Sequence, residues 1–571
     1  MSTYARPFAD HLAAASDEQL DHLLRVRGVR ADPGWQDFFD AAEALLEPSS
    51  IQRVLPALTA PEAAALLRAD AGGDAGAQRD ILSSWGLLQP DGAPWPPVSE
   101  AVRGRPVPDT GDGADVRPSS PAAAAPAAER AFTTVARLAD LLLLARDAPF
   151  ALLAGGALSA AEKRQLVDAG VPVEGIDALV DLAHVAGLTA AAERRLAVTA
   201  QGESWLRSPA AERWAHLATA FRDALPRGLR SADDGWIAPT AWDDAHPWDP
   251  AWPQRSAALH DLARLLGLIA DDGTEPEWAT PLRTGADARG SATALAALLP
   301  TEVDRIFLQN DLTAIAPGPL APALDVRLRT IAARESAAQA SSYRFSEESL
   351  TRGLILGETE QSILDFLDGI SLTGIPQPLS YLVTRSAARH GLVRVSTDAE
   401  TERTRVESSD VHLLQAIAVD QVLAPIGLVR HTDSLTTNVA RDTVYWALVD
   451  ARYPATLIGP DGAALLGDRR RAGASSPDPA PAADYAALIA RLREHRGPDA
   501  DAAWLGRELE AAVRARAVLR VTVGMPDGST RDLLLEATGL GGGRLRGRDR
   551  AADVERTLPV SSIRSAAVVE A

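Results

Sequence analysis

One stretch of the chain sets the expected fold: residues 176–198 read IDALVDLAHVAGLTAAAERRLAV. Its first half has the apolar spacing of a helix, and Gly187 suits the left-handed position that closes one. Leu188 then opens a short strand, residues 190–194 form a polar turn, and Leu196 begins a second strand. Helix, glycine, strand, turn and strand is the sequence outline of a winged helix, so the stretch predicts one.

A Gly-Leu pair follows helical sequence at four further places, which begin at Gly86, Gly267, Gly391 and Gly427. The intervals between them are unequal, so the chain is not a solenoid repeat. We therefore expect several winged-helix modules in a multidomain, mainly α chain. Such modules either read DNA or dock on proteins, and the pattern leaves both roles open.

Two stretches have the composition of linkers. Residues 103–130 are rich in Pro, Gly and Ala, and residues 468–483 alternate proline with small side chains. Such sequences stay extended or disordered. The expected domains are a helical or winged-helix domain at 1–102, winged-helix modules at 131–300, an α+β domain at 301–467, and helices followed by a small β barrel at 484–571.

The last domain changes its hydrophobic period. Tyr485, Leu488, Ile489 and Leu492 lie at i, i+3, i+4 and i+7, which predicts one apolar helix face. From Val518 the period is two, and turn residues separate several short strands. A small antiparallel β barrel is the expected result.

Composition excludes several classes of protein. The chain has no cysteine, which excludes disulfides, zinc fingers and thiol nucleophiles. Lys163 is its single lysine, and the net charge is −20, so the molecule as a whole is not a polycation that coats nucleic acid. We find neither a signal sequence nor an apolar run of membrane-spanning length, and we expect a soluble cytoplasmic protein without membrane contact.

The central segment carries a family resemblance. The run IFLQNDLTAIAPG at 306–318 is followed by Tyr343-Arg344-Phe345, by PQPLSYLV at 376–383 and by ARHGL at 388–392. In order and spacing these resemble the accessory domain of XPB-type helicases and of bacterial helicase-associated proteins. The resemblance implies structural roles for a set of motif residues: Gln309, Asp311, Leu312, Tyr343, Ser349, Pro376, Gln377, His390 and Gly391. The β unit from about Val513 resembles the small barrel of WYL-type regulators, although the Trp-Tyr-Leu signature is missing.

The chain lacks the motor that an XPB-type helicase needs. A phosphate-binding glycine loop ends in Lys-Ser or Lys-Thr, and an Asp-Glu strand end holds magnesium. Lys163 stands instead in the helical sequence AAEKR, and the pair Asp17-Glu18 has the signature of a helix start. We therefore predict no enzyme activity, no catalytic residue, no metal site and no cofactor.

The candidate nucleic-acid contacts are arginines in two places. On an expected strand, alternating arginines share one face, with another arginine near the preceding hairpin. The second group surrounds the helix-to-strand corner of the family segment. The two sets are Arg544, Arg546, Arg548 and Arg550 with Arg531, and Arg385, Arg389 and Arg394. The strand set forms either a phosphate track or a solubilising edge paired with Asp549 and Asp553.

The sequence thus favours a non-catalytic factor in DNA repair or transcription that binds DNA or accompanies a helicase. Its expected partners are DNA and an XPB-type helicase or another repair or transcription protein. The alternative is a protein–protein adaptor whose acidic body binds a helicase and whose winged helices never touch DNA. A basic stripe on those modules favours the first role, and an acidic surface favours the second.

Overall fold

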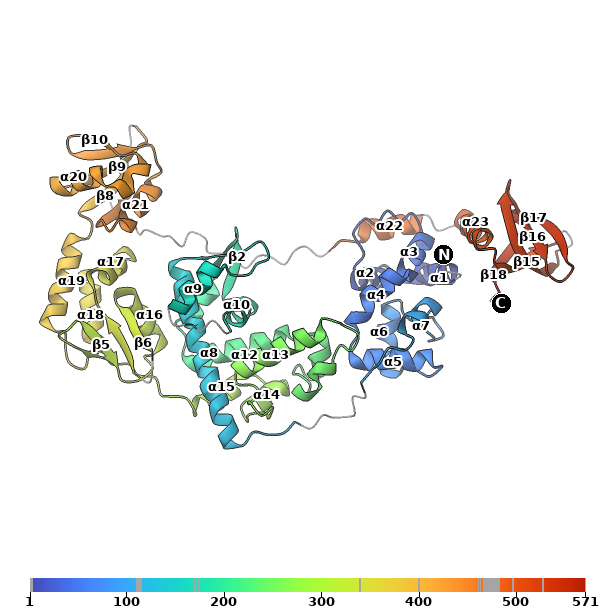
Figure 1. The fold of residues 1–571 in the computed structure, drawn as a ribbon, viewed down its shortest axis with the longest axis horizontal. Coiled ribbons are helices and arrows are strands. Elements are labelled where there is room, and N and C mark those ends of the chain that lie inside the picture. Colours follow the sequence, from blue (N-terminus) through green and yellow to red (C-terminus); the bar gives the residue numbers. More distant parts are fainter. Residues whose placement is uncertain are drawn as a thin grey trace.

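The computed structural model describes residues 4–108, 116–168, 171, 175–337, 340–398, 401–460, 462, 464–465, 483–494, 498–525 and 528–569. About half of the chain is helical, and the strands form several separate sheets. Figure 1 shows a series of packed bodies, with the N- and C-termini close to the same end of the molecule. The expected linker at 468–483 lies outside the described residues except for its last position.

The N-terminal module is a helical bundle whose core lies between residues 5 and 102. Side-chain caps start two of its helices: Ser16 accepts a bond from the Gln19 amide at 3.2 Å, and Asp37 accepts one from the Phe39 amide at 3.0 Å. The helices are α1 (Ala5–Ala14), α2 (Asp17–Val26), α3 (Phe38–Leu46), α4 (Pro48–Val54), α5 (Ala60–Asp70), α6 (Arg79–Ser84) and α7 (Pro96–Val102).

The second module begins earlier than the sequence suggests. Its first helix, α8 (Pro121–Asp147), starts inside the segment expected to be a linker through residue 130. Ser120 caps it, accepting a bond from the Ala123 amide at 3.3 Å. Pro126 lies inside the helix, where it cannot donate to the carbonyl four residues before it, but the alanines after it are buried and their packing offsets this lost bond. The linker prediction is therefore wrong from residue 121 onward.

A three-stranded sheet follows α8 in the order β1-β3-β2, and it is antiparallel throughout. The order along the chain is a helix, a strand, two helices and two strands. The stretch at 176–198 forms the predicted helix and two strands, but residues 190–192, expected in the turn, belong to the first of these strands. The elements are β1 (Phe150–Ala151), α9 (Ala160–Asp168), α10 (Ile176–Val185), β2 (Thr189–Ala192), β3 (Arg195–Val198), α11 (Ala200–Trp205), α12 (Ala210–Ala224), α13 (Trp252–Leu265), α14 (Ala279–Arg283) and α15 (Ala288–Ala296).

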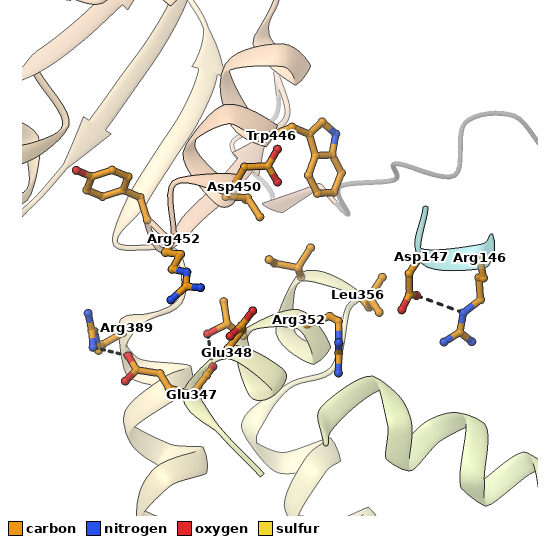
Figure 2. A pocket seen from close by; sticks show the side chains of 14 residues that line it. Arg146, Asp147, Glu347, Glu348, Arg352, Leu356, Arg389, Trp446, Asp450 and Arg452 are labelled. Atoms are coloured by element: carbon orange, nitrogen blue, oxygen red, sulfur yellow. Dashed lines mark hydrogen bonds and ion pairs between the residues drawn. The ribbon is translucent and has the colours of Figure 1, made fainter. Parts of the chain in front are cut away.

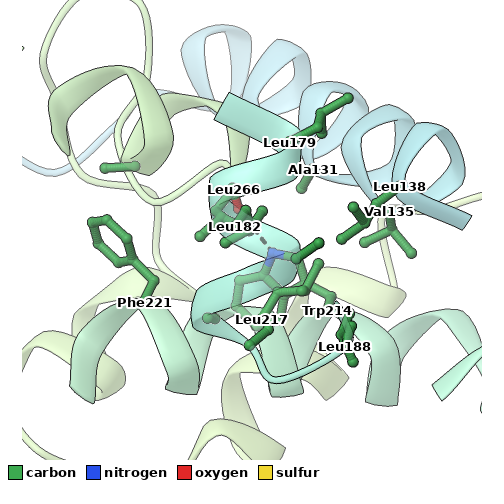
Figure 3. Packing of buried hydrophobic residues seen from close by; sticks show 14 of the residues in the cluster. Ala131, Val135, Leu138, Leu179, Leu182, Leu188, Trp214, Leu217, Phe221 and Leu266 are labelled. Atoms are coloured by element: carbon green, nitrogen blue, oxygen red, sulfur yellow. Dashed lines mark hydrogen bonds between the residues drawn. The ribbon is translucent and has the colours of Figure 1, made fainter. Parts of the chain in front are cut away.

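Tryptophans are prominent in the core of the second module. Trp214 of α12 is 1% exposed, and its indole Nε1 donates to the Leu266 carbonyl at 2.8 Å. Figure 3 shows this ring among side chains from α8, α10 and α12. All seven tryptophans between Trp205 and Trp278 are buried, so they are core residues rather than a surface for stacking bases.

The third module holds two sheets. The first has the antiparallel order β4-β5-β7-β6, and the second has the order β10-β11-β9-β8-β12-β13, in which β12 and β8 are parallel. The elements are β4 (Phe307–Leu308), β5 (Thr313–Ala316), α16 (Pro322–Ile331), β6 (Ala333–Ala337), β7 (Ser341–Arg344), α17 (Glu347–Ile355), α18 (Glu360–Ile370), α19 (Gln377–Arg389), β8 (Val393–Thr397), β9 (Thr404–Ser408), α20 (Val411–Val419), β10 (Val429–Arg430), β11 (Ser434–Thr437), α21 (Arg441–Asp450), β12 (Ala455–Ile458) and β13 (Ala464–Leu465).

The C-terminal sheet is open. Its antiparallel order is β17-β16-β15-β14-β18, and the edge strands do not pair with each other, so the predicted closed barrel is wrong. Helix α23 covers the face that carries Leu519 and Leu535. The elements are α22 (Ala486–Glu494), α23 (Pro498–Ala515), β14 (Val518–Gly524), β15 (Thr530–Gly541), β16 (Arg544–Asp549), β17 (Val554–Pro559) and β18 (Ile563–Val568).

The five predicted Gly-Leu corners all have a glycine in the left-handed region, with φ between 60° and 80°. At Gly267 a side chain is also excluded by space, because a Cβ there would lie 2.5 Å from the Ala127 carbonyl oxygen of α8. The corner therefore lets α13 pack closely against α8.

The N-terminal and second modules meet around His246. Its Nδ1 lies 3.1 Å from the Leu58 carbonyl oxygen, and the Ala60 amide donates to the Ala245 carbonyl at 2.9 Å. The Nε2 atom is buried and has no hydrogen-bond partner among the described residues. Burial lowers the pKa of this imidazole, so it is neutral with its proton on Nδ1.

This imidazole predicts an acid-sensitive contact. The pKa of such a histidine is lower in the folded protein than the value of 6.5 in the unfolded protein. The neutral ring therefore contributes fully to the stability of the folded protein above pH 6.5, and this contribution is lost as the pH falls below 6.5. Wild type should therefore lose thermal stability between pH 7.5 and pH 5.5, and His246→Gln should lose less. Melting curves at both pH values measure the difference, with the exposed His431→Gln as control; equal losses in wild type and His246→Gln would contradict the assignment.

Candidate nucleic-acid interface

Helix α19 has one face in the core and one in solvent. Pro376 precedes its first turn, where the missing N–H of Pro378 costs nothing. Leu379 and Val383 are buried against α17 and α18. This packing fixes which side chains point outward.

The outward face is polar and aromatic. Its exposed residues Gln377, Tyr381, Thr384, Arg385 and Ala388 have the spacing of a single stripe. The Tyr381 side chain is 67% exposed. No acidic residue occurs anywhere in Gln377–Arg389, so the stripe carries only positive charge.

The two arginines of α19 differ in their ion pairs. Arg389 forms an ion pair with Glu347 of α17, and the Thr384 hydroxyl donates to Glu360 Oε1 of α18 at 2.7 Å. Arg385, by contrast, makes no ion pair with any residue that the structure describes. Arg385 is therefore the cation of this helix that is available to an outside anion.

The β8–β9 hairpin follows α19 directly. Arg394 is exposed on β8 opposite Glu407 of β9, and no ion pair of Arg394 occurs within the described ranges. Arg405 beside it pairs with Glu407 at 2.7 Å, and Arg403 donates to the Asn438 side chain at 2.8 Å. The hairpin thus adds Arg394 to the cation on α19.

The corner between helix and hairpin is structural. His390 is partly buried, and burial lowers its pKa, so its ring does not offer a positive charge at neutral pH. Its Nε2 lies 3.4 Å from the Thr456 hydroxyl of β12. Gly391 has φ +80°, which turns the chain from α19 into β8.

The first family motif forms the turn between β4 and β5. The Thr313 hydroxyl donates to Gln309 Oε1 at 2.9 Å and to Asp311 Oδ1 at 2.5 Å. That bond lowers the pKa of the Asp311 carboxyl. Leu312 has φ +65°, a left-handed conformation that the turn requires, and its carbonyl accepts the Phe345 amide at 2.9 Å. Gln309 and Asp311 are exposed and tie this turn together.

Two further motif residues lie inside the module. The Tyr343 hydroxyl donates to Asp325 Oδ1 at 2.7 Å, and burial raises the pKa of this phenol. Ser349 is buried; its hydroxyl donates to the Ile331 carbonyl at 2.8 Å and completes a capping box with Ser346. Pro376 and Gln377 differ from these, since Pro376 directly precedes α19 and Gln377 begins its exposed stripe.

Only some of the five arginines predicted near β16 lie on the same face of the C-terminal sheet. Arg544, Arg546 and Arg548 are exposed and alternate with buried residues on β16, whereas Arg550 lies beyond the strand end. Arg531 is in register with the buried Val523 and therefore lies on the opposite face of the sheet. Arg531 is thus no neighbour of the other four, because strand parity decides the face.

Carboxylates occupy one end of this row. Arg548 pairs with Asp553 at 2.7 Å, and Arg550 lies 3.5 Å from Glu536. The other predicted partner, Asp549, is buried and pairs with Arg556 at 2.6 Å. Arg544 and Arg546 are therefore the only members of this row that have no carboxylate partner among the described residues.

The second module has the opposite charge at the equivalent helix. The outward face of α10 carries Asp177, Asp181, His184 and Val185. Asp177 and Asp181 are exposed, and Lys163 of α9 pairs with Asp177 at 2.7 Å. Carboxylates repel phosphates, so this face is unsuited to DNA.

A cavity of about 840 Å³ opens between α8, α17 and α21 (Figure 2). Arg389 and Glu347 pair at its rim, and the Trp446 ring forms part of its wall. Arginines and carboxylates are equally represented, so the cavity has no net attraction for an anion. Its charged lining residues are Arg146, Arg352, Arg389, Arg452, Asp147, Glu347, Glu348 and Asp450.

Tyr381 is the site residue that sequence reasoning missed. It stands inside the quoted motif PQPLSYLV, four positions after Gln377 and four before Arg385. That spacing places all three on one helix face, a signal available from the sequence once the helix is assigned.

The comparisons with known proteins concern the same part of the chain. The family model described as a helicase conserved C-terminal domain matches residues 306–432, from the start of the first sheet of the third module to the end of β10. No protein of curated function matches the chain. Among the described residues, no helix is long and apolar enough to cross a membrane, and no three histidine or acidic side chains are grouped to hold a metal ion.

Proposed function

We propose that this chain is a helicase-related factor without a motor of its own, which binds duplex DNA through the exposed face of α19. The observation that carries the proposal is the acid-free stripe of α19 inside the segment that matches a helicase domain. Helices α17, α18 and α19 followed by the β8–β9 hairpin have the element order of a winged helix. In helix-turn-helix proteins the corresponding helix lies in the major groove.

The side chains of the stripe suit that placement. Glutamine and arginine bond to the edges of adenine and guanine, and a threonine contacts either base type. Arg385 on α19 and Arg394 on β8 supply charge for phosphates on the two sides of such a contact. Because the chain carries a charge of −20, attraction has to be local, within a screening length of ~8 Å at physiological salt.

We propose no ATP-hydrolysing motor in this chain, because the lysine that such a motor needs is not in the required sequence. The single lysine, Lys163, lies in the middle of α9 and pairs with Asp177, and the sequence GGALSAAEKR at 155–164 lacks the Gly-Lys-Ser or Gly-Lys-Thr of a phosphate-binding loop. We infer that an XPB-type helicase supplies the motor in repair or transcription and that this chain accompanies it. The open C-terminal sheet would then be a WYL-like accessory unit, with Arg544 and Arg546 as a second phosphate contact.

The acidic face of α10 favours a second candidate function for one module. Asp177 and Asp181 would repel DNA there, so the second module serves as a docking unit for a protein in this account. A chain that binds DNA at α19 and protein at α10 combines both roles. If DNA binding fails, the adaptor role alone remains.

The experiment is a titration of labelled duplex and single-stranded DNA with the full chain at several salt concentrations. Duplex binding should weaken with a slope of about −3.6 in log K against log salt, since Arg385, Arg394, Arg544 and Arg546 contact four phosphates and each contributes ~0.9. Binding at low salt with that slope, and no ATP hydrolysis with or without DNA, is the expected result. A failure to bind any duplex at low salt would refute the DNA-binding function.

A further inference from the structure

One end of the exposed face of the C-terminal sheet carries arginines without carboxylates opposite them. Arg544 and Arg546 are exposed there on β16, and neither forms an ion pair among the described residues. Their cross-strand neighbours on the two adjacent strands are all uncharged: Gly541, Gly539, Pro559 and Thr557. A Cβ added at either glycine would meet no heavy atom within 4 Å, so the space beside the arginines is open. A phosphate can therefore reach both guanidinium groups.

This face suits phosphates rather than bases. Residues 505–571 contain no aromatic side chain, so no ring is present on which a base could stack. Two arginines two positions apart on one strand are separated by roughly 7 Å along it. Each neutralises one phosphate of a DNA backbone. The contact is therefore electrostatic and independent of the DNA sequence.

Helix α22 ties the C-terminal block to the N-terminal module. Its apolar face lies in a groove of that module beside α2 (Figure 1). Four apolar anchors in the groove are only 1–5% exposed: Tyr485, Leu488, Ile489 and Leu492. The Tyr485 hydroxyl donates to the Val29 carbonyl at 2.5 Å, and Arg493 pairs with Asp17 at 3.0 Å. These contacts fix α22 on the N-terminal module.

Helix α23 connects the same module to the sheet. Leu509 of this helix is buried together with Leu535 in the core of the sheet. On the same helix, Arg507 bonds to Asp40 of the N-terminal module at 2.7 Å, and its guanidinium lies 4.9 Å from the Phe39 ring centroid. The sheet is therefore held at the N-terminal module.

Two further interfaces lead from the N-terminal module to the third module. Arg227 of the second module donates to Glu62 Oε2 at 2.8 Å, and Trp248 is 6% exposed in the core of the N-terminal module. Asp140 of the second module accepts a bond from Arg329 of the third at 2.7 Å. Direct contacts therefore connect the C-terminal sheet to the third module, interface by interface.

The two arginine faces lie at opposite ends of the molecule (Figure 1). Helix α19 lies at one end of the longest axis and the sheet with β16 at the other, with the N-terminal and second modules between them. Because hydrogen bonds, ion pairs and buried side chains hold each interface on the way, the faces keep this separation. They therefore contact different segments of DNA.

We propose that this chain holds two segments of duplex DNA at once, one on α19 and one on Arg544 and Arg546, and so bridges DNA. The inference rests on the DNA binding proposed for α19 and adds a bridging function to it. On a long duplex the two segments belong to one DNA molecule, whereas two short duplexes occupy the faces separately.

A bridging assay with the full chain at low salt tests the proposal. One short duplex is attached to beads, and a second short duplex of the same length is labelled and free. Wild type should retain the labelled duplex on the beads, and sedimentation should give two short duplexes per chain. Arg544→Ser/Arg546→Ser should lower this retention at least tenfold, because both phosphate contacts of one face are lost. The double variant should still bind one short duplex.

The matched control is Arg548→Ser, because Arg548 lies on the same face but already pairs with Asp553 at 2.7 Å, and it should retain the labelled duplex as wild type does. Equal retention by wild type and the double variant would overturn the second contact. A wild type that binds one short duplex per chain and retains none would overturn bridging while the function at α19 stands. A wild type that binds no duplex would overturn both.

Discussion

Asp140→Ala should destabilise the contact between the second and third modules by about 3–5 kcal/mol, the cost of removing one partner of a buried ion pair. Asp140 lies on α8, and its Oδ1 accepts a bond from Arg329 of α16 at 2.7 Å. Its other oxygen pairs with Arg334 of β6. The three side chains are only 15–17% exposed, so removal of the carboxylate leaves two guanidinium groups without their main partner.

Thermal and denaturant unfolding, with limited proteolysis between the modules, measure this loss. Glu129→Ala is the matched control, because it removes an exposed carboxylate of the same helix that has no ion pair among the described residues, and it should change stability by less than ~0.5 kcal/mol. Equal stability of the Asp140 and Glu129 variants would contradict the assigned interface.

Trp214→Ala should destabilise the second module by about 3–5 kcal/mol, as large truncations in a packed core do. The indole is 1% exposed, and it contacts side chains from several helices (Figure 3). Its loss also leaves the Leu266 carbonyl without the bond it accepts at 2.8 Å. The midpoint of the module's thermal transition measures the effect.

Trp214→Phe separates the two causes. It keeps most of the buried volume but removes the hydrogen bond and a small part of the ring, so its cost should be less than half that of the alanine variant. A phenylalanine variant as unstable as the alanine variant would show that the hydrogen bond, and not the packing, dominates.

Local patterns predicted much of the fold. The five Gly-Leu corners and the apolar face from Tyr485 to Leu492 are all present in the structure. Each depends on a few neighbouring residues, and the backbone chemistry is the same wherever such a pattern occurs.

The failures concern long-range choices. The alternation of the C-terminal strands predicted a sheet, but closure depends on whether the first and last edges meet, and β17 and β18 do not pair. The apolar face of α22 could be predicted from its own residues. The groove that it contacts could not, because that groove lies more than 450 residues earlier in the chain. For α8, the prolines suggested a linker, and burial of the alanines against the second module outweighs that tendency.

The candidate site was predicted in part. Arg385 and Arg394 were selected for charge and have no ion pair among the described residues, while Arg389 pairs with Glu347. Charge alone did not reveal Tyr381, because its importance comes from the helix face that it shares with Gln377 and Arg385. In the β16 set, the pair of Arg548 with Asp553 agrees with the alternative of a paired edge, whereas the contact of Arg550 with Glu536 of β15 depends on the strand register and was not predicted.

The most direct test of the account is the affinity for duplex DNA of the double variant Gln377→Ala/Arg385→Ser, measured by titration at low salt. Loss of the base contact of Gln377 and the phosphate contact of Arg385 should weaken binding at least tenfold, since one good bidentate base contact is worth ~1–3 kcal/mol. Arg289→Ser is the matched control, because Arg289 is an exposed arginine on α15 without an ion pair among the described residues. The account predicts a large loss in the α19 variant and wild-type affinity in the control; equal affinity of both variants and wild type would contradict it.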